Sequence, residues 1–141
     1  EQALIKDVTK LLLELGTGFA FLGNQYHLNI GGEDFYVDLL FYNLNLRCYV
    51  VIELKTGEFK PEYVGQLNFY LSAVDSVLKK ELDNSTIGLL LCKTKNNLVA
   101  EYSLKDISKP IGVSEYKITD NLPDEFEKQL PSIEDIQSRI K

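Results

Sequence analysis

The 141-residue sequence contains no methionine and no tryptophan, and it has one histidine and two cysteines. No run approaches the roughly 18 apolar residues of a membrane span, and no signal-peptide pattern opens the chain, so we expect no membrane partner. Cys48 and Cys92 lie in apolar runs, which favours buried free thiols and a cytoplasmic location. Because the chain opens on Glu1 and lacks methionine, we expect it to be an excised part of a longer protein, with a segment missing upstream.

Basic residues are also scarce. Fifteen lysines and arginines stand against twenty-one aspartates and glutamates, which gives a net charge of −6. An acidic domain is repelled by phosphate backbones at long range, although part of the excess lies in residues 121–141. The balance therefore counts against general affinity for nucleic acid but not against a local site. A hydrophobic content of 45% is enough for one compact domain, which we expect to span residues 1–141.

Apolar periodicity and turn residues predict an alternating order of helices and strands. We expect helices at 3–15 and 61–82, a short helix within 95–106, and a polar helical tail at 122–140. Strands are expected at 19–23, 25–30, 34–42, 47–55, 86–92 and 112–118, with Gly23-Asn24 as a turn between the first two. This order describes an α/β sandwich with a mixed sheet.

The run VVIELK places two opposite charges, Glu53 and Lys55, in what otherwise reads as a buried strand. The preceding strand also contains a charged residue, Asp38, in an otherwise apolar run. A short loop centred between Asn45 and Leu46 would set Asp38 opposite Glu53, with their Cβ atoms about 4.5–5.5 Å apart. Like charges at that distance are destabilising unless a cation lies between them, and oxygen ligands suit Mg²⁺ or Mn²⁺ better than zinc.

A lysine beside such a cation has a chemical use. Lys55 could orient or deprotonate an attacking water, or neutralise charge that develops on a phosphate. The structural alternative is a salt bridge at a strand end, between Glu53 and either Lys55 or Lys60, with Asp38 facing solvent. Spacing alone leaves both interpretations open.

Asp38 followed by Glu53-Leu54-Lys55 resembles the D…(D/E)-x-K core of the PD-(D/E)xK nuclease superfamily, although Val37 replaces the usual proline. The resemblance implies a restriction-endonuclease-like αβββαβ core, a mixed sheet flanked by helices. It also implies that Asp38, Glu53 and the backbone carbonyl of Leu54 bind the metal, Mg²⁺ or Mn²⁺, and that Lys55 assists hydrolysis.

The helix after this motif contains Gln66 and Tyr70, similar to the Q-x-x-x-Y element of the exonuclease-like branch. One helical turn separates them, so both could reach a phosphate or a metal-bound water. The alternative is a surface amide beside a packed tyrosine. The superfamily often supplies a metal ligand from its first helix, which implies Glu14; an ordinary surface glutamate is the alternative. His27 and Gln25 share a strand face, and we expect His27 to be structural. By placement alone, Gln25 and Tyr26 could line the cleft.

Nearly the whole chain resembles the C-terminal domain of the YhcG-type family of bacterial candidate nucleases, in residues 11–28, 31–43, 51–75, 86–93 and 109–116. The resemblance implies that this C-terminal domain follows an upstream N-terminal domain, in agreement with the start at Glu1. It also implies a metal-dependent hydrolase of phosphodiester bonds, with DNA favoured over RNA as the partner and a homodimer possible. The alternative is a nuclease fold with a weak or inactive site, kept for docking nucleic acid or for dimerisation.

Overall fold

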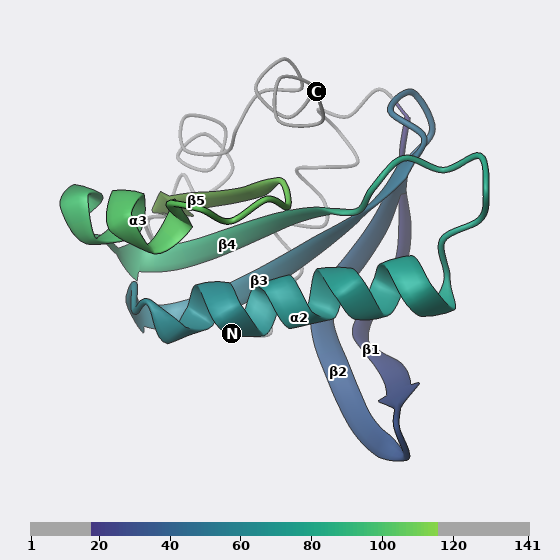
Figure 1. Ribbon diagram of the computed structural model, residues 1–141, viewed down its shortest axis with the longest axis horizontal. Coiled ribbons are helices and arrows are strands. Elements are labelled where there is room, and N and C mark those ends of the chain that lie inside the picture. Colours follow the sequence, from purple (N-terminus) through teal and green to yellow (C-terminus); the bar gives the residue numbers. More distant parts are fainter. Residues whose placement is uncertain (1–17, 116–141) are drawn as a thin grey trace, which may run out of the picture.

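The computed structural model describes residues 18–115 (Figure 1). Within this range the elements are β1 (Phe19–Ile30), β2 (Glu33–Asn43), β3 (Cys48–Glu58), α2 (Glu62–Val77), β4 (Ile87–Thr94), α3 (Asn97–Leu104) and β5 (Ile111–Glu115). They form a five-stranded sheet in the order β1-β2-β3-β4-β5. The first three strands pair antiparallel, whereas β4 runs parallel to β3 and β5 parallel to β4. The expected α/β fold with a mixed sheet is confirmed.

Each face of the sheet carries its own apolar cluster. On one face α2 packs across the strands (Figure 1). Its buried residues Val64, Leu67, Leu71 and Val74 belong to the same apolar cluster as Val51 of β3. The other face holds a separate cluster of residues from β2, β3 and β4. Residues 87–92 of β4 are buried throughout, as expected for a parallel strand covered on both faces.

The two cysteines belong to different clusters. Cys48 lies in the cluster away from α2 and Cys92 in the cluster beneath α2, and both are buried free thiols. Burial raises the pKa of Cys48 to about 12 and that of Cys92 to about 11. Both side chains therefore act as small apolar core residues, in agreement with the sequence-based expectation.

One strand prediction was wrong. Residues 19–23 and 25–30 are not two strands joined by a turn at Gly23-Asn24, because both segments pair with β2 as one strand, β1. Its register shifts by one residue between Phe21 and Gly23, which identifies a β-bulge there. Gly23 has φ 156°, a backbone conformation open to glycine. The glycine that suggested a turn thus accommodates an irregularity within a strand.

The expected helix at 61–82 is shorter, since α2 begins at Glu62 and ends at Val77. Pro61 takes the N-cap position rather than the first turn. Leu82 lies beyond the end of the helix and is 77% exposed. The carboxylate of Asp83 instead accepts the backbone N–H of Lys80 at 2.9 Å, which favours a turn.

The remaining expectations are met in part. The short helix expected within 95–106 is α3, which Asn96 caps by accepting the backbone N–H groups of Leu98 and Val99. The strand expected at 112–118 is described as Ile111–Glu115. The helices predicted at 3–15 and 122–140 lie outside the described residues. No helix within 18–115 has the length and apolar character needed to cross a membrane.

The sheet divides at the end of the β2–β3 ladder. The last residues that pair along it are Leu39 of β2 and Ile52 of β3. Beyond this point β2 stays paired with β1 as a hairpin that projects past the rest of the sheet, while β3 stays paired with β4 (Figure 1). We call the place where β2 and β3 separate the strand fork. Val37 and Leu40 both belong to the cluster beneath α2, whereas Leu39 belongs to the cluster on the opposite face. The regular alternation of side chains along β2 is therefore interrupted at the fork.

Candidate active site at the strand fork

Asp38 and Glu53 occupy the first positions beyond the paired segment of β2 and β3. Their side chains replace the missing ladder bonds. The backbone N–H of Asp38 donates to Glu53 Oε2 at 2.8 Å, and the backbone N–H of Leu54 donates to Asp38 Oδ2 at 2.8 Å. The two carboxylates thus satisfy amide groups that the separating strands leave free, and these bonds keep them close to one another.

Glu53 is a buried carboxyl group with a like charge beside it. Its residue is 3% exposed. Burial first, and then the charge of Asp38, raise the pKa of Glu53 to about 8, although the backbone N–H of Asp38 and the charge of Lys55 act in the opposite direction. A cation between the carboxylates would relieve both causes of this shift. Asp38 is half-buried, so the pair opens toward solvent on one side.

A polar chain from α2 continues the site. The Nζ of Lys55 donates to Gln66 Oε1 at 3.2 Å and lies 4.6 Å from the centroid of the Tyr63 ring. Gln66 Nε2 in turn donates to the hydroxyl of Tyr70 at 3.3 Å. Burial, followed by the charge of Glu53, raises the pKa of Tyr70, so its phenol stays protonated at neutral pH. The structure therefore connects Lys55 to α2 through Gln66, and Tyr70 holds the amide of Gln66.

Gln25 is a member of this site that the sequence did not identify as functional. Its Nε2 donates to Asp38 Oδ1 at 3.0 Å. Its backbone has φ 46°, the left-handed region that costs a non-glycine residue about 1–2 kcal/mol. The sequence indicated only that Gln25 could line the cleft by its placement. The signal that could have given it a role is its position two residues after Gly23, the glycine of the bulge.

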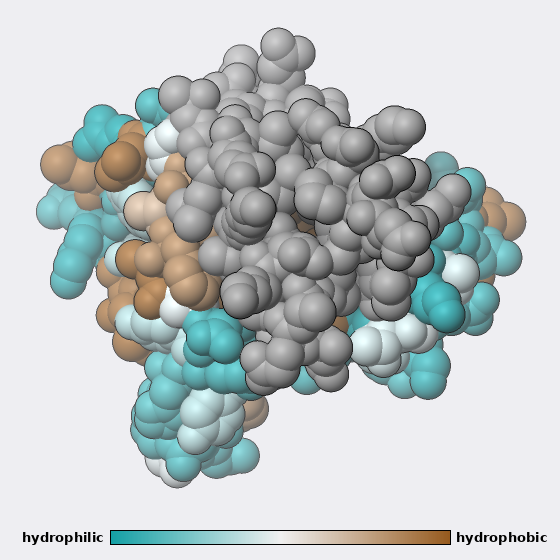
Figure 2. Space-filling model, turned by 180° about the vertical axis from the view of Figure 1, so that it is seen from behind, coloured by the Kyte–Doolittle hydropathy of each residue, from teal (hydrophilic) through white to brown (hydrophobic). Residues whose placement is uncertain are grey.

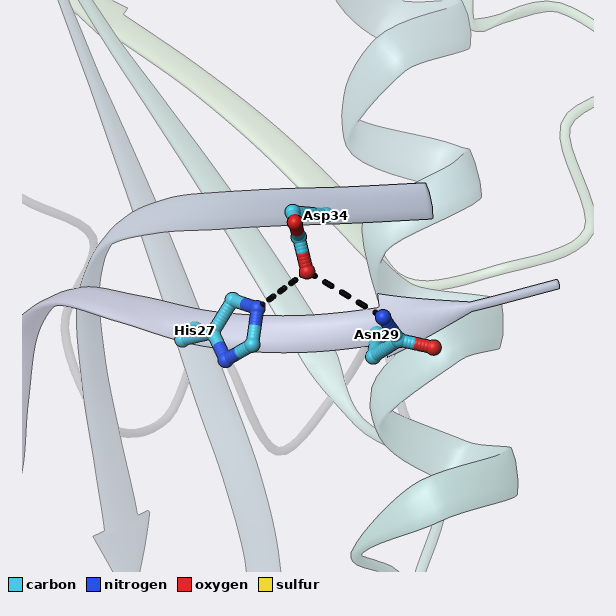
Figure 3. A network of polar contacts seen from close by, with 3 residues as sticks. All are labelled: His27, Asn29 and Asp34. Atoms are coloured by element: carbon cyan, nitrogen blue, oxygen red, sulfur yellow. Dashed lines mark hydrogen bonds and ion pairs between the residues drawn. The ribbon is translucent and has the colours of Figure 1, made fainter. Parts of the chain in front are cut away.

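A second polar cluster lies further along the hairpin (Figure 3). His27 Nε2 is 2.7 Å from Asp34 Oδ1, which also accepts Asn29 Nδ2 at 3.1 Å. The bonds from His27 and then Asn29 lower the pKa of Asp34. The ring of Tyr36 lies 5.1 Å from that of His27. In Figure 2 the projecting end of the hairpin is hydrophilic, which agrees with these exposed side chains.

The chemistry of the fork fits a hard divalent cation. Asp38 and Glu53 offer carboxylate oxygens from adjacent strands, and Mg²⁺ commonly takes one or two carboxylates and completes its shell with water and substrate. Among residues 18–115 no third histidine, cysteine, aspartate or glutamate joins them to form a larger metal-binding group. Glu14, the further ligand expected from the sequence, lies outside the described residues. Leu54 is present through its N–H, and a ligand role for its carbonyl stays a prediction.

The comparisons with known proteins identify relatives over most of the chain. The family model described as the YhcG PDDEXK nuclease domain matches residues 1–131. The protein named Putative nuclease YhcG, from Escherichia coli (strain K12), is 41% identical over 125 residues, which cover 89% of this chain. The chain spans only 33% of the length of that relative.

Solved structures agree on the fold. A repair endonuclease from Pyrococcus abyssi superposes with a TM-score of 0.55 at 15% identity, covering 79% of this chain and 46% of the other. EndoMS in a complex with dsDNA also gives a TM-score of 0.55, at 20% identity, covering 81% of this chain and 45% of the other. At these identities the likeness is one of fold: the sheet and its flanking helices are of the restriction-endonuclease-like type.

Proposed function

This chain belongs to the YhcG PDDEXK nuclease domain family, and from that membership we propose that it hydrolyses phosphodiester bonds of DNA with Mg²⁺ or Mn²⁺ at the strand fork. The observation that carries the proposal is the pair formed by Asp38 and buried Glu53, with Lys55 on the same strand. A packed sheet gains nothing from two opposed carboxylates unless a cation or proton joins them.

The residues of the fork would divide the work as follows. Asp38 and Glu53 would hold the cation, which when bound acts as a Lewis acid on the phosphate. Lys55 would orient the attacking water and stabilise negative charge that develops on the phosphate. Gln66 fixes the ammonium of Lys55 by accepting from it, and Tyr70 holds the amide of Gln66 from the other side.

The substrate class is part of the proposal. One structural neighbour, EndoMS, is described in a complex with dsDNA, which supports a DNA substrate for a chain of the same fold. Because the E. coli relative is about three times as long as this chain, we propose that an upstream domain contributes to substrate binding in the whole protein. A homodimer, in which each copy cuts one strand of a duplex, is the assembly we propose for double-strand cleavage.

The test joins metal binding to cleavage. Mn²⁺ and Mg²⁺ are titrated by calorimetry into the wild-type chain and into Asp38→Asn and Glu53→Gln, and the same proteins are incubated with labelled duplex DNA and RNA. We expect metal binding and DNA cleavage by the wild type, and the loss of both in the two variants. Asp34→Asn removes an exposed aspartate from the same strand outside the fork, and it should retain both.

Two results would contradict the proposal. Equal metal binding by the wild type and the fork variants would leave the carboxylates with a structural role only. Metal binding without cleavage of either nucleic acid, in the chain and in the full-length protein, would favour the docking or dimerisation module.

A further inference from the structure

The backbone of β1 is irregular where it passes the fork. Gln25 has φ 46° in the middle of a 12-residue strand, where side chains with a Cβ rarely adopt this conformation. Glycine would adopt it without a steric penalty, and asparagine tolerates it better than glutamine does. The irregular geometry thus occurs at a residue that is poorly suited to it.

The side chain of Gln25 is exposed, so packing does not account for its presence. Its Nε2 instead donates to Asp38 Oδ1 at 3.0 Å, while the backbone N–H of Leu54 donates to Asp38 Oδ2 at 2.8 Å. Each oxygen of the Asp38 carboxylate therefore receives one neutral donor, from β1 on one side and from β3 on the other. This arrangement fixes the carboxylate plane and leaves further lone pairs on both oxygens.

We propose that Gln25 is a positioning residue, and that β1 retains its unfavourable backbone conformation because this aims the Gln25 amide at the metal-facing carboxylate of Asp38. The proposal rests on the proposed function, because it assigns Gln25 to the same cation site. Strained backbone persists where the surroundings impose it, and such outliers concentrate at functional sites. Side chains that orient a ligand are worth about 10- to 100-fold in metal affinity.

The test separates the effect of the positive φ of Gln25 from the effect of its side-chain amide. Gln25→Gly relieves the positive φ and removes the amide, and Gln25→Asn tolerates the positive φ but carries an amide one methylene shorter. Arg47→Gly and Asp106→Gly are matched controls, since both residues also have positive φ, 55° and 65°, and neither belongs to the fork. Urea unfolding midpoints are measured without metal, and Mn²⁺ affinity is measured by calorimetry.

We expect Gln25→Gly to unfold at the same or a higher urea concentration than the wild type while binding Mn²⁺ about tenfold or more weakly. Gln25→Asn should also bind weakly, because its amide cannot reach Asp38. Both control variants should keep wild-type Mn²⁺ affinity. A purely structural role for Gln25 would lower the unfolding midpoint together with the Mn²⁺ affinity. It would not lower the affinity alone.

Three results would contradict the role proposed for Gln25, and each has a different meaning for the proposed function. Wild-type Mn²⁺ affinity in Gln25→Gly would overturn the role of Gln25 and leave the proposed function intact. A lower unfolding midpoint in both Gln25 variants, with a parallel loss of affinity, would make Gln25 a structural residue. If the wild type binds Mn²⁺ no more tightly than Asp38→Asn does, the metal site is overturned, and the role of Gln25 with it.

Discussion

At the scale of single residues, the fork holds Glu53 in an unfavourable environment. The carboxyl group is buried beside Asp38, and its pKa is raised from an ordinary value of 4.5 to about 8. The folded domain therefore keeps a proton that the unfolded chain releases above pH 4.5. The stabilising contribution of that proton is fully present below pH 4.5 and is lost as the pH rises toward 8.

Glu53→Gln should make the metal-free domain more stable at pH 8, because a neutral amide has no charge to desolvate and its oxygen can still accept the Asp38 N–H. We expect a gain of a few kcal/mol at pH 8, from about 1.4 kcal/mol per unit of pKa shift, and almost none near pH 4. Urea unfolding of both proteins across this pH range measures the difference. A gain that does not change with pH would show that Glu53 carries no raised pKa.

Lys55 should act on the rate rather than on metal affinity. Its ammonium is fixed by Gln66 and by the face of the Tyr63 ring. We expect Lys55→Met to lower kcat on DNA by about 10²–10⁴-fold with little change in Mn²⁺ affinity, because a positioned proton carrier or charge contributes about that much. Single-turnover cleavage measures the effect. Lys60→Gln, at a neighbouring exposed lysine, should cleave like the wild type, and an equal loss in both variants would argue for a general effect of charge.

At the scale of elements, the packing of α2 against β4 determines the positions of Gln66 and Tyr70. A Cβ built on Gly88 of β4 would lie 3.0 Å from the Cγ and Cδ2 atoms of Leu67, a buried residue of α2. Leu67 immediately follows Gln66, so any displacement of the helix moves the amide that holds Lys55. The glycine of this strand thus sets the distance between the helix and the sheet.

Gly88→Ala should therefore destabilise the domain by about 1–3 kcal/mol, the usual cost of overpacking a core, and should also lower the cleavage rate. Gly65→Ala is the control within α2, because nothing lies within 4 Å of its Cβ position. That substitution should stabilise the helix by about 0.5–1 kcal/mol. Thermal and urea unfolding compare the two, and a neutral result for Gly88→Ala would show that Leu67 adjusts without moving the helix.

At the scale of the whole molecule, the net charge of −6 opposes the approach of a polyanion. A domain with this balance gains no long-range attraction to nucleic acid from its net charge. Two of the acidic residues, Asp38 and Glu53, lie at the fork, where the phosphate would have to bind. Binding should then depend on the cation that neutralises the fork, more than on the release of counterions along the DNA.

We expect Lys55→Met, which should bind without cleaving, to bind duplex DNA more tightly in Mg²⁺ than in EDTA. Its affinity should fall only gently with salt, as for about three phosphate contacts or fewer. Fluorescence anisotropy over a range of salt concentrations measures both quantities. Adding Asp38→Asn to this variant should remove the advantage of Mg²⁺. Equal binding in EDTA and in Mg²⁺ would instead locate the DNA contacts away from the fork.

Much of the arrangement follows from local sequence patterns. The four residues between Asn43 and Cys48 close the β2–β3 hairpin with the expected register. Asp38 and Glu53 are neighbours just beyond the last ladder pair, joined by side-chain bonds to backbone N–H groups rather than by the ladder. The i, i+4 spacing of Gln66 and Tyr70 likewise places them within hydrogen-bonding distance. Turn length and helical period are local properties, and for that reason the sequence alone determined these pairs.

Other features were decided only by the tertiary structure. The sequence suggests a turn at Gly23, but β2 pairs with the residues on both sides of it. The placement of Gln25 in the sequence gives it no partner, whereas the structure combines a positive φ with a hydrogen bond to Asp38. The separation of β2 from β3 likewise depends on which other strand each one pairs with. These features depend on contacts between segments that are distant in the sequence. The periodicity of a single segment therefore cannot predict them.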